Sequence, residues 1–430
     1  MSESITAFWE LSQAVIKGIP LAVLGGTPAS GIFWLFSALV LMQYRRIESN
    51  ESRLYGAVKN KSLNQTLRSL GWGLVGGTVA SILLVYIGIP LSDSGIAYLF
   101  PVALLLMFMS PRLMCFAYSG GIISMSYLLF GWPRVNVAAI MALVGILHLT
   151  ESLLIRLSGA GCSTPLFVRN ARNELVGGFG VQRFWPMPLI AVFLMSSLAG
   201  QPTEGWIATP EWWPLLGLRE SALANTNFFY VLFPVAAGLG YGDIAVTCSP
   251  RQRAQKTSLV LCVYSAVLIL LALAASRLRV FEWVVALFAP LGHEVVARRG
   301  SKAELTGDAK FVRPEEGVMV LDVLPGSEAE QAGIRSGDVV LEINGRRVSS
   351  RDEMRVAIEE TPSLLEMVVR EEGAPGRERL VKMGRVVDSL GVISVPEPGD
   401  ETHVEFRTGG PLARLFQKVL AFLGIDIQDK

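Results

Sequence analysis

The first two thirds of the chain consists mainly of long apolar runs separated by short polar segments. A helix needs about 20 apolar residues to cross the hydrocarbon core of a bilayer. The runs predict spanning helices near residues 27–44, 70–89, 96–109, 113–131, 135–157, 184–200, 228–246 and 257–275. A shorter run at residues 280–291 is also predicted to cross, because a tilted helix or a thinned bilayer accommodates a short span. We therefore expect a polytopic membrane domain over residues 27–292, with about eight or nine spans.

The segment before these runs, residues 1–26, has a different pattern. Apolar side chains such as Trp9, Leu11 and Val15 are interleaved with polar ones. This pattern is typical of an amphipathic helix that lies in the membrane interface. The segment could instead form half of a re-entrant hairpin closed by Gly25 and Gly26.

From residue 298 onward the pattern changes to short alternating stretches bounded by turn residues. The strings GVMVLDV, VVLEI, LLEMVVRE and RERLVKM predict strands, and Asn344-Gly345 predicts a type I′ hairpin turn. Residues 351–360 predict an amphipathic helix with Met354, Ala357 and Ile358 on one face. We therefore expect a multi-span α-helical membrane domain followed by a small α+β domain at residues 298–397. The latter would be a partly open β-barrel with two helices.

The last segment, residues 398–430, reads as a linker followed by an amphipathic helix. Apolar residues between 411 and 424 recur at helical spacing. Such a helix would pack on the membrane surface, on a partner, or on the preceding small domain.

Lysine and arginine are distributed unevenly between the predicted loops. The first loop carries a basic cluster, made up of Arg45, Arg46, Arg53, Lys59, Lys61 and Arg68. Basic residues accumulate in cytoplasmic loops, so this loop is predicted to be cytoplasmic. Counting onward, the loops at Arg112, at 169–183 and at 251–256 fall on the same side. If the run at 280–291 crosses, the small C-terminal domain of this multi-pass cell-membrane protein is cytoplasmic as well.

Composition agrees with a membrane protein and excludes some other classes. Apolar residues make up 51% of the chain and charged residues 17%, whereas soluble domains carry about a quarter of charged residues. The net charge is +1 and the basic residues sit in short loops, which argues against nucleic-acid binding. The four cysteines are scattered without metal-ligand spacing. We predict no metal site and no cofactor.

The string HEVVA, which begins at His293 and Glu294, is the strongest catalytic candidate. Intramembrane metalloproteases use H-E-x-x-H, in which two histidines one turn apart bind zinc and the glutamate acts as a base. Here Ala297 stands where the second histidine would be. We therefore predict no catalytic residues.

His148 and Glu151 form a second polar pair within an apolar run. At spacing i and i+3 they share one helix face, and ionisable groups inside a membrane are costly and are candidates for function. We favour a structural pair, with His293 or Arg156 as a further partner, over a catalytic one.

The order of strands, turns and helices after residue 298 resembles a bacterial-type PDZ domain. This resemblance implies that an extended or C-terminal peptide of a partner protein adds as a strand to a sheet edge. The groove would lie beside the helix that carries Met354, Ala357 and Ile358. The string SLGVISVP resembles the carboxylate-binding turn and edge strand of such domains. It would contribute Leu390, Gly391, Val392 and Ile393. Alternatively, LGVISV is simply a closing strand of the domain.

Several strings together resemble the MinJ-type proteins, multi-span PDZ proteins of division-site selection in Gram-positive bacteria. These strings are QYRRIESNESRLYG, HLTES, GYGDIAVTCSPRQ and LFAPLGHEVVARRG. The resemblance implies a non-enzymatic membrane scaffold whose partners are the lipid bilayer, a DivIVA-like protein and Min-type division proteins. Two alternatives remain open at this point: an intramembrane peptidase or a regulator of one, and a transporter-like domain with a regulatory PDZ domain.

Overall fold

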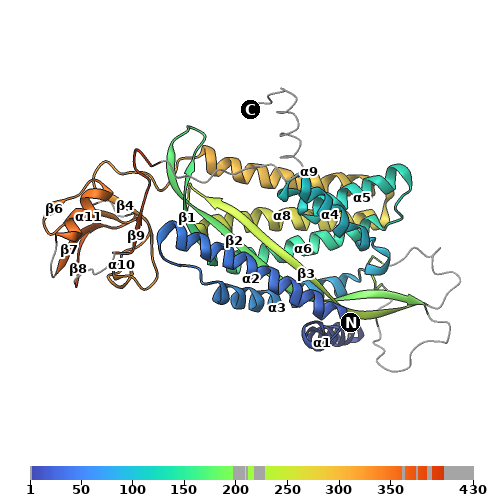
Figure 1. Cartoon of the computed structure of the whole chain (residues 1–430). Helices are drawn as coiled ribbons and strands as arrows, with labels where there is room; N and C mark the ends of the chain where they lie inside the picture. The colour runs from blue at the N-terminus through green and yellow to red at the C-terminus, as the bar shows by residue number, and fades with distance from the viewer. Residues whose placement is uncertain are drawn as a thin grey trace, which may run out of the picture.

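The computed structural model describes residues 2–196, 209, 212–216, 228–360, 364–373, 376–384 and 390–400. The N-terminal membrane domain consists of helices packed around a long three-stranded sheet (Figure 1). Its helices are α1 (Ser2–Leu24), α2 (Pro28–Tyr55), α3 (Ser62–Ile87), α4 (Ile96–Met109), α5 (Phe116–Phe130), α6 (Val137–Ser158), α8 (Pro250–Arg277) and α9 (Arg279–Thr306). Its strands are β1 (Ser163–Arg169), β2 (Leu175–Ser196) and β3 (Phe228–Ala245). Short 3-10 turns lie at Leu91–Asp93, Pro111–Met114 and Gly159–Gly161.

Local sequence signals fix the ends of several helices. The Thr27 side chain caps the start of α2, and Gly56 ends that helix in the left-handed conformation. Ser249 and Gln252 form a complete capping box at the start of α8. These caps define where the long helices begin and end, and short segments connect one element to the next, as expected for a compact bundle.

Five of the described helices are long and apolar enough to cross a membrane. They cover Thr6–Leu24, Ser62–Ile87, Val137–Gly161, Pro250–Arg277 and Arg279–Thr306. Two further apolar helices, α4 and α5, are shorter. This confirms the predicted multi-span helical membrane domain. The short run at residues 280–291 is part of α9, a continuous helix of 28 residues.

Two of the predicted spanning helices are wrong. The runs at residues 184–200 and 228–246 lie largely in β2 and β3, which form one long antiparallel hairpin. The register pairs Phe179 with Ala245 at one end and Ser196 with Phe228 at the other. Apolar content alone does not distinguish a strand buried against helices from a spanning helix.

Where β1 does not pair with β2, neighbouring helices cover the backbone hydrogen-bonding groups along that edge of β2. Pro186 and Pro188 have no N–H to leave unpaired, and the Ile190 N–H donates to the Ser81 hydroxyl of α3 at 2.8 Å. Gly73 and Gly77 of α3 lie directly against the carbonyl oxygens of the two prolines. The hairpin therefore lies within the helical domain without an exposed row of unpaired backbone donors on this edge, which a membrane interior would penalise.

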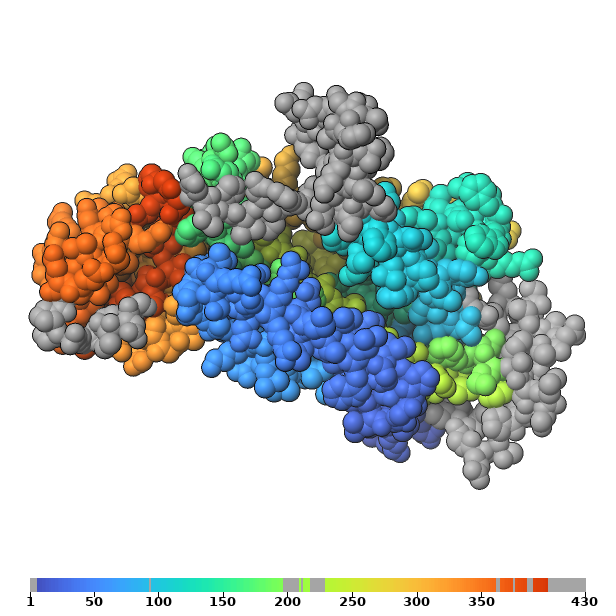
Figure 2. Space-filling view, viewed as in Figure 1, coloured from blue at the N-terminus to red at the C-terminus, as the bar shows by residue number. Residues whose placement is uncertain are grey.

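The C-terminal domain is a small sheet with helices, at one end of the membrane domain (Figures 1 and 2). Its elements are β4 (Val318–Val323), α10 (Glu328–Gln331), β5 (Val339–Ile343), β6 (Arg346–Arg347), α11 (Arg351–Glu359), β7 (Leu365–Arg370), β8 (Glu378–Met383) and β9 (Val392–Ser394). The strand order is β8-β7-β5-β4-β9, with β6 paired to β5. Asn344 and Gly345 both have positive φ, which confirms the predicted hairpin turn. The predicted C-terminal helix at 411–424 lies outside the described residues.

Candidate functional site

The candidate peptide groove lies between α11 and β9. Met354, Ala357 and Leu390 are buried in one apolar cluster of the small domain, and Ile358 and Val392 pack against it half-buried. Within the described part of the chain, β9 pairs only with β4, so its second edge has no strand partner. An edge of this kind beside an amphipathic helix is suited to accept an extended peptide as an added strand.

Five of the seven predicted groove residues are therefore brought together here, Gly391 lies between two of them in the chain, and the seventh, Ile393, differs. The Ile393 side chain packs half-buried in a separate cluster against the membrane domain. Because side chains alternate along a strand, Ile393 points to the opposite face from Val392. Only the backbone of Ile393 could therefore contact a peptide in the groove. Peptide binding by these residues stays a prediction.

Gly391 occupies a position that only glycine fits. Its φ is 76°, and a Cβ built there would lie 2.2 Å from the Cβ of Ser327. Its carbonyl accepts from the Leu324 N–H at 2.8 Å, and the Leu390 carbonyl accepts from the Ala329 N–H at 3.2 Å. The turn before β9 is thus held close to the start of α10, which leaves its shape well defined.

Arg351 ties the start of α11 to the end of β9. Its guanidinium donates to the Ser394 hydroxyl at 2.8 Å and to the Asp400 carboxylate at 2.9 Å. Burial acts to raise the pKa of Asp400, but the Glu397 N–H and the Arg351 charge together hold this pKa below its usual range. The pair fixes one end of the groove.

The small domain is docked on the membrane domain through an apolar contact. Leu321 and Val395, on the outward face of β4 and the segment after β9, are buried against Phe179 and Ala245 of the long hairpin. Phe311, in the connection from α9, is 1% exposed and completes this cluster. The Gly177 N–H donates to the Phe311 carbonyl at 2.9 Å. The two domains therefore share a core and are not joined by a free linker.

An ion pair borders the same junction. Lys59, in the loop between α2 and α3, lies 2.5 Å from the carboxylate of Asp322 in β4. The Asp322 side chain is 10% exposed and that of Lys59 is 25% exposed. Burial raises the pKa of Asp322 above its ordinary value, and the Lys59 charge opposes this only in part. The first basic loop of the chain is thus in direct contact with the small domain.

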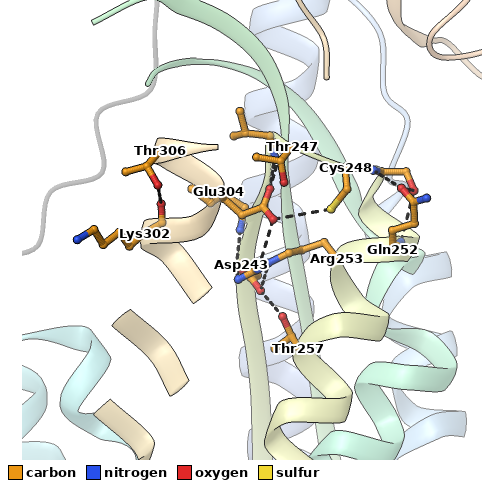
Figure 3. Close-up of polar contacts among 12 residues, drawn as sticks. Asp243, Thr247, Cys248, Gln252, Arg253, Thr257, Lys302, Glu304 and Thr306 are labelled. Carbon is orange, nitrogen blue, oxygen red and sulfur yellow. Dashed lines mark hydrogen bonds and ion pairs between the residues drawn. The ribbon is translucent and has the colours of Figure 1, made fainter. Parts of the chain in front are cut away.

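A buried polar network anchors α9 where it approaches the small domain (Figure 3). Arg253 of α8 donates to both carboxylate oxygens of Asp243, at 2.8 and 3.0 Å. Arg253 also lies 3.4 Å from the Glu304 carboxylate of α9, which accepts the backbone N–H groups of Val246 and Thr247 at 2.8 Å each. The network gives a structural role to the string GYGDIAVTCSPRQ, because Asp243 and Arg253 both belong to it.

The four intramembrane polar candidates, His148, Glu151, His293 and Glu294, do not all meet at one site. His148 and His293, which the sequence suggested as partners, lie face to edge with ring centroids 5.2 Å apart. Glu294 lies 2.8 Å from Arg112 and also accepts from Tyr118 and Arg298. Glu151 lies one turn after His148 on α6. The carboxylate of Glu294 is thus occupied by hydrogen-bond donors.

Sequence reasoning missed the residues of the domain junction and one residue beside the histidines. Cys115 lies between His148 and His293, but the three are far apart in sequence and no spacing rule connects them. At the junction, Phe311 stands in a segment with no motif of its own, and its burial depends on two domains meeting.

Comparison with known proteins agrees with this architecture. A family model described as a PDZ domain matches residues 319–371. The chain is 24% identical over 389 residues to the probable cell division topological determinant MinJ of Lacticaseibacillus paracasei, covering 86% of this chain and 96% of that protein. It is 21% identical over 238 residues to MinJ of Bacillus subtilis, a match that spans 55% of each protein. The chain thus spans about half the length of the Bacillus subtilis protein in that alignment.

Matches to proteases are confined to the PDZ region. Serine protease HTRA1 of Xenopus laevis is 36% identical over 73 residues, which is 17% of this chain. The similarity that extends over the membrane domain is to the MinJ proteins. The chain is therefore a MinJ-like protein, with several helices long enough to cross a membrane and a PDZ domain at residues 319–371.

Proposed function

We propose that this chain is a non-enzymatic membrane scaffold that recruits partner proteins to the cytoplasmic face of the cell membrane through its PDZ domain. The similarity to MinJ over 86% of the chain is the observation that carries the proposal. The name of that relative, a probable cell division topological determinant, suggests division-site selection as the process. DivIVA-like and Min-type division proteins are the partner class that follows from it.

The placement of basic residues supports a cytoplasmic PDZ domain. Lys59 contacts the PDZ domain itself, and Arg172 pairs with Asp308 in the connection leading to it. Arg253 lies in the network beside the end of α9. Basic loops face the cytoplasm. The end of the bundle that carries these residues is therefore expected to face the cytoplasm, together with the PDZ domain docked there.

The chemistry near His293 favours a scaffold over a peptidase. A site-2-type metalloprotease needs a glutamate that is available as a base. Glu294 is held by Arg112, Arg298 and Tyr118, and Ala297 replaces the second histidine of the motif. The resemblance to proteases in the PDZ region concerns a peptide-binding module that many unrelated proteins use.

The proposal is tested by crosslinking in cells followed by isolation of the full chain and of a version that ends at residue 306. The full chain is expected to retain a set of division proteins that the shortened chain loses. Both forms must reach the membrane in equal amounts, which membrane fractionation checks. A partner list that does not change on removal of the PDZ domain would refute the scaffold as proposed.

A further inference from the structure

Three side chains that bind transition metals meet inside the helical bundle. Cys115 precedes α5, His148 lies in the middle of α6, and His293 lies in the middle of α9. Their ligand atoms all lie within 4.8 Å of one another. The Cys115 Sγ is 3.0 Å from Nε2 of His148 and 3.5 Å from Nε2 of His293. His148 is only 4% exposed, and the other two are half-buried.

Hydrogen bonds orient both imidazoles toward the sulfur. His148 Nδ1 lies 2.8 Å from the Val144 carbonyl, which can only accept, so Nδ1 carries the proton and Nε2 presents a lone pair. His293 Nδ1 lies 3.4 Å from the Tyr118 hydroxyl, whose own proton is directed to the Glu294 carboxylate. The Val144 carbonyl behind His148 and the carboxylate-linked Tyr118 hydroxyl behind His293 can each accept from Nδ1–H, which is the arrangement found around metal-ligating histidines.

The hydrogen bonds at Nδ1 favour the tautomer in which each histidine presents its Nε2 lone pair to the sulfur. In these tautomers two Nε2 lone pairs face one sulfur, and a thiol has a single hydrogen to donate. One imidazole lone pair would therefore face the sulfur without a proton between them. A metal ion bound to all three atoms satisfies the two nitrogens and the sulfur together.

The distances fit a tetrahedral zinc-type centre. Zinc–sulfur bonds of about 2.3 Å and zinc–nitrogen bonds of about 2.0–2.1 Å place sulfur and nitrogen roughly 3.5 Å apart at a tetrahedral angle. The two observed separations are 3.0 and 3.5 Å. The two nitrogens lie within 4.8 Å of each other. The backbone N–H of Ala117 donates to Cys115 Sγ at 3.4 Å and orients it.

We propose that Cys115, His148 and His293 bind one transition-metal ion of the zinc class. One sulfur and two imidazole ligands favour Zn²⁺ over Mg²⁺ or Ca²⁺, which prefer oxygen. The ion holds the start of α5 to α6 and α9. Because α9 leads directly into the PDZ domain, the ion stabilises the helix on which that domain is mounted. This proposal departs from the sequence expectation of no metal site.

The first experiment measures metal content of the purified full chain in detergent. The protein is stripped with a chelator, reloaded with Zn²⁺ or Co²⁺ alone, desalted, and measured by mass spectrometry of the elements. We expect one ion per chain, and a thiolate-to-cobalt charge-transfer absorption in the Co²⁺ form. Cys115→Ser, His148→Gln and His293→Gln are expected to lose the ion. Cys262→Ser, a change of another half-buried cysteine, is expected to keep it.

A second measurement needs no variant and guards against misfolded ones. Alkylation of the native full chain is followed at each cysteine with and without Zn²⁺. The proposal predicts that Zn²⁺ slows modification of Cys115 at least tenfold and leaves Cys262 unchanged. Less than one ion in ten chains, no charge-transfer band, or equal alkylation of Cys115 with and without Zn²⁺ would each overturn the proposal. Metal retained at full occupancy in Cys115→Ser would also do so.

Discussion

Gly77 of α3 and Pro188 of β2 are in backbone contact: a Cβ built on Gly77 would lie 2.1 Å from the Pro188 carbonyl oxygen. Gly73 and Pro186 have the same relationship one helical turn earlier, with 2.0 Å. The two glycines, four residues apart, line one face of α3. They let the helix approach the strand closely enough to cover its edge, and carbonyl oxygens so near to glycine Cα atoms can form weak C–H···O contacts.

This contact makes Gly77→Ala destabilising. The added methyl group meets backbone, which cannot move aside as a side-chain end can, and overpacking of this kind costs about 1–3 kcal/mol. Gly71→Ala on the same helix is the matched control, because a Cβ there meets nothing within 4 Å. Removing a glycine from an open helical position stabilises by up to about 1 kcal/mol. Thermal unfolding of the full chain in detergent should therefore shift in opposite directions for the two variants. Equal shifts would contradict the packing described.

The sequence predicted the PDZ domain well because its signals are local. Asn344-Gly345 and the amphipathic pattern of α11 each depend on a few adjacent residues, and the structure agrees with both. The hairpin β2–β3 was missed because its apolar runs are as long as a spanning helix. Two signals were available. Pro186 and Pro188 stand too close together for a helix interior, and glycines at 238, 240 and 242 alternate with the period of a strand.

Contacts between distant segments could not be predicted from the sequence in the same way. Ile393 was placed in the groove by its motif, but it faces the membrane domain because the two domains dock. Cys115 is one of four cysteines that are scattered in the sequence without metal-ligand spacing, whereas the fold brings it between two histidines. In both cases the deciding partner lies more than 30 residues away in the chain.

Arg253 is predicted to be the most sensitive residue of the buried network. Arg253→Met leaves the carboxylates of Asp243 and Glu304 without their shared cation, and breaking a buried ion pair in this way costs about 3–5 kcal/mol. Arg253→Lys should rescue only in part, because one ammonium cannot replace the two hydrogen bonds to Asp243. Arg251→Met, an exposed neighbour, should leave the melting temperature unchanged. An Arg253→Met protein as stable as the Arg251→Met protein would exclude this role.

The junction between the domains should depend on pH through Asp322. Its pKa in the folded protein lies above the ordinary value of 3.8, so the folded state favours the protonated form. The resulting stability is present below the unfolded pKa and is lost as the pH rises through the folded pKa. Lys59→Met removes the opposing charge, raises this pKa further, and should loosen docking at neutral pH.

The control for this prediction is Asp322→Asn, which cannot ionise. It should remove the pH dependence and leave docking at neutral pH at least as tight as in the wild type. Hydrogen exchange of the backbone of β4 (Val318–Val323) in the full chain reports on docking. If Asp322→Asn loosens β4 more than Lys59→Met does, the conclusion that burial raises the pKa of Asp322 more than Lys59 lowers it is wrong.

The orientation of the chain is tested by labelling introduced cysteines in intact cells with a membrane-impermeant maleimide. Asp352→Cys lies on the exposed surface of α11, and Arg134→Cys precedes α6 at the end opposite the PDZ domain. We expect Arg134→Cys to react at once and Asp352→Cys to react only after the membrane is permeabilised. The wild-type chain measures background from its native cysteines. The reverse order would place the PDZ domain outside the cell.

The most direct test of the central claim is quantitative co-isolation of partners with variants of the peptide groove. Ile358→Glu places a charge on the groove face of α11, where Ile358 is half-buried, whereas Arg355→Glu changes the exposed face of the same helix. Both proteins should be present in the membrane at wild-type levels. The scaffold account predicts that Ile358→Glu loses at least 90% of the crosslinked division proteins and that Arg355→Glu retains them. Full retention of these partners by Ile358→Glu would contradict recruitment through the groove.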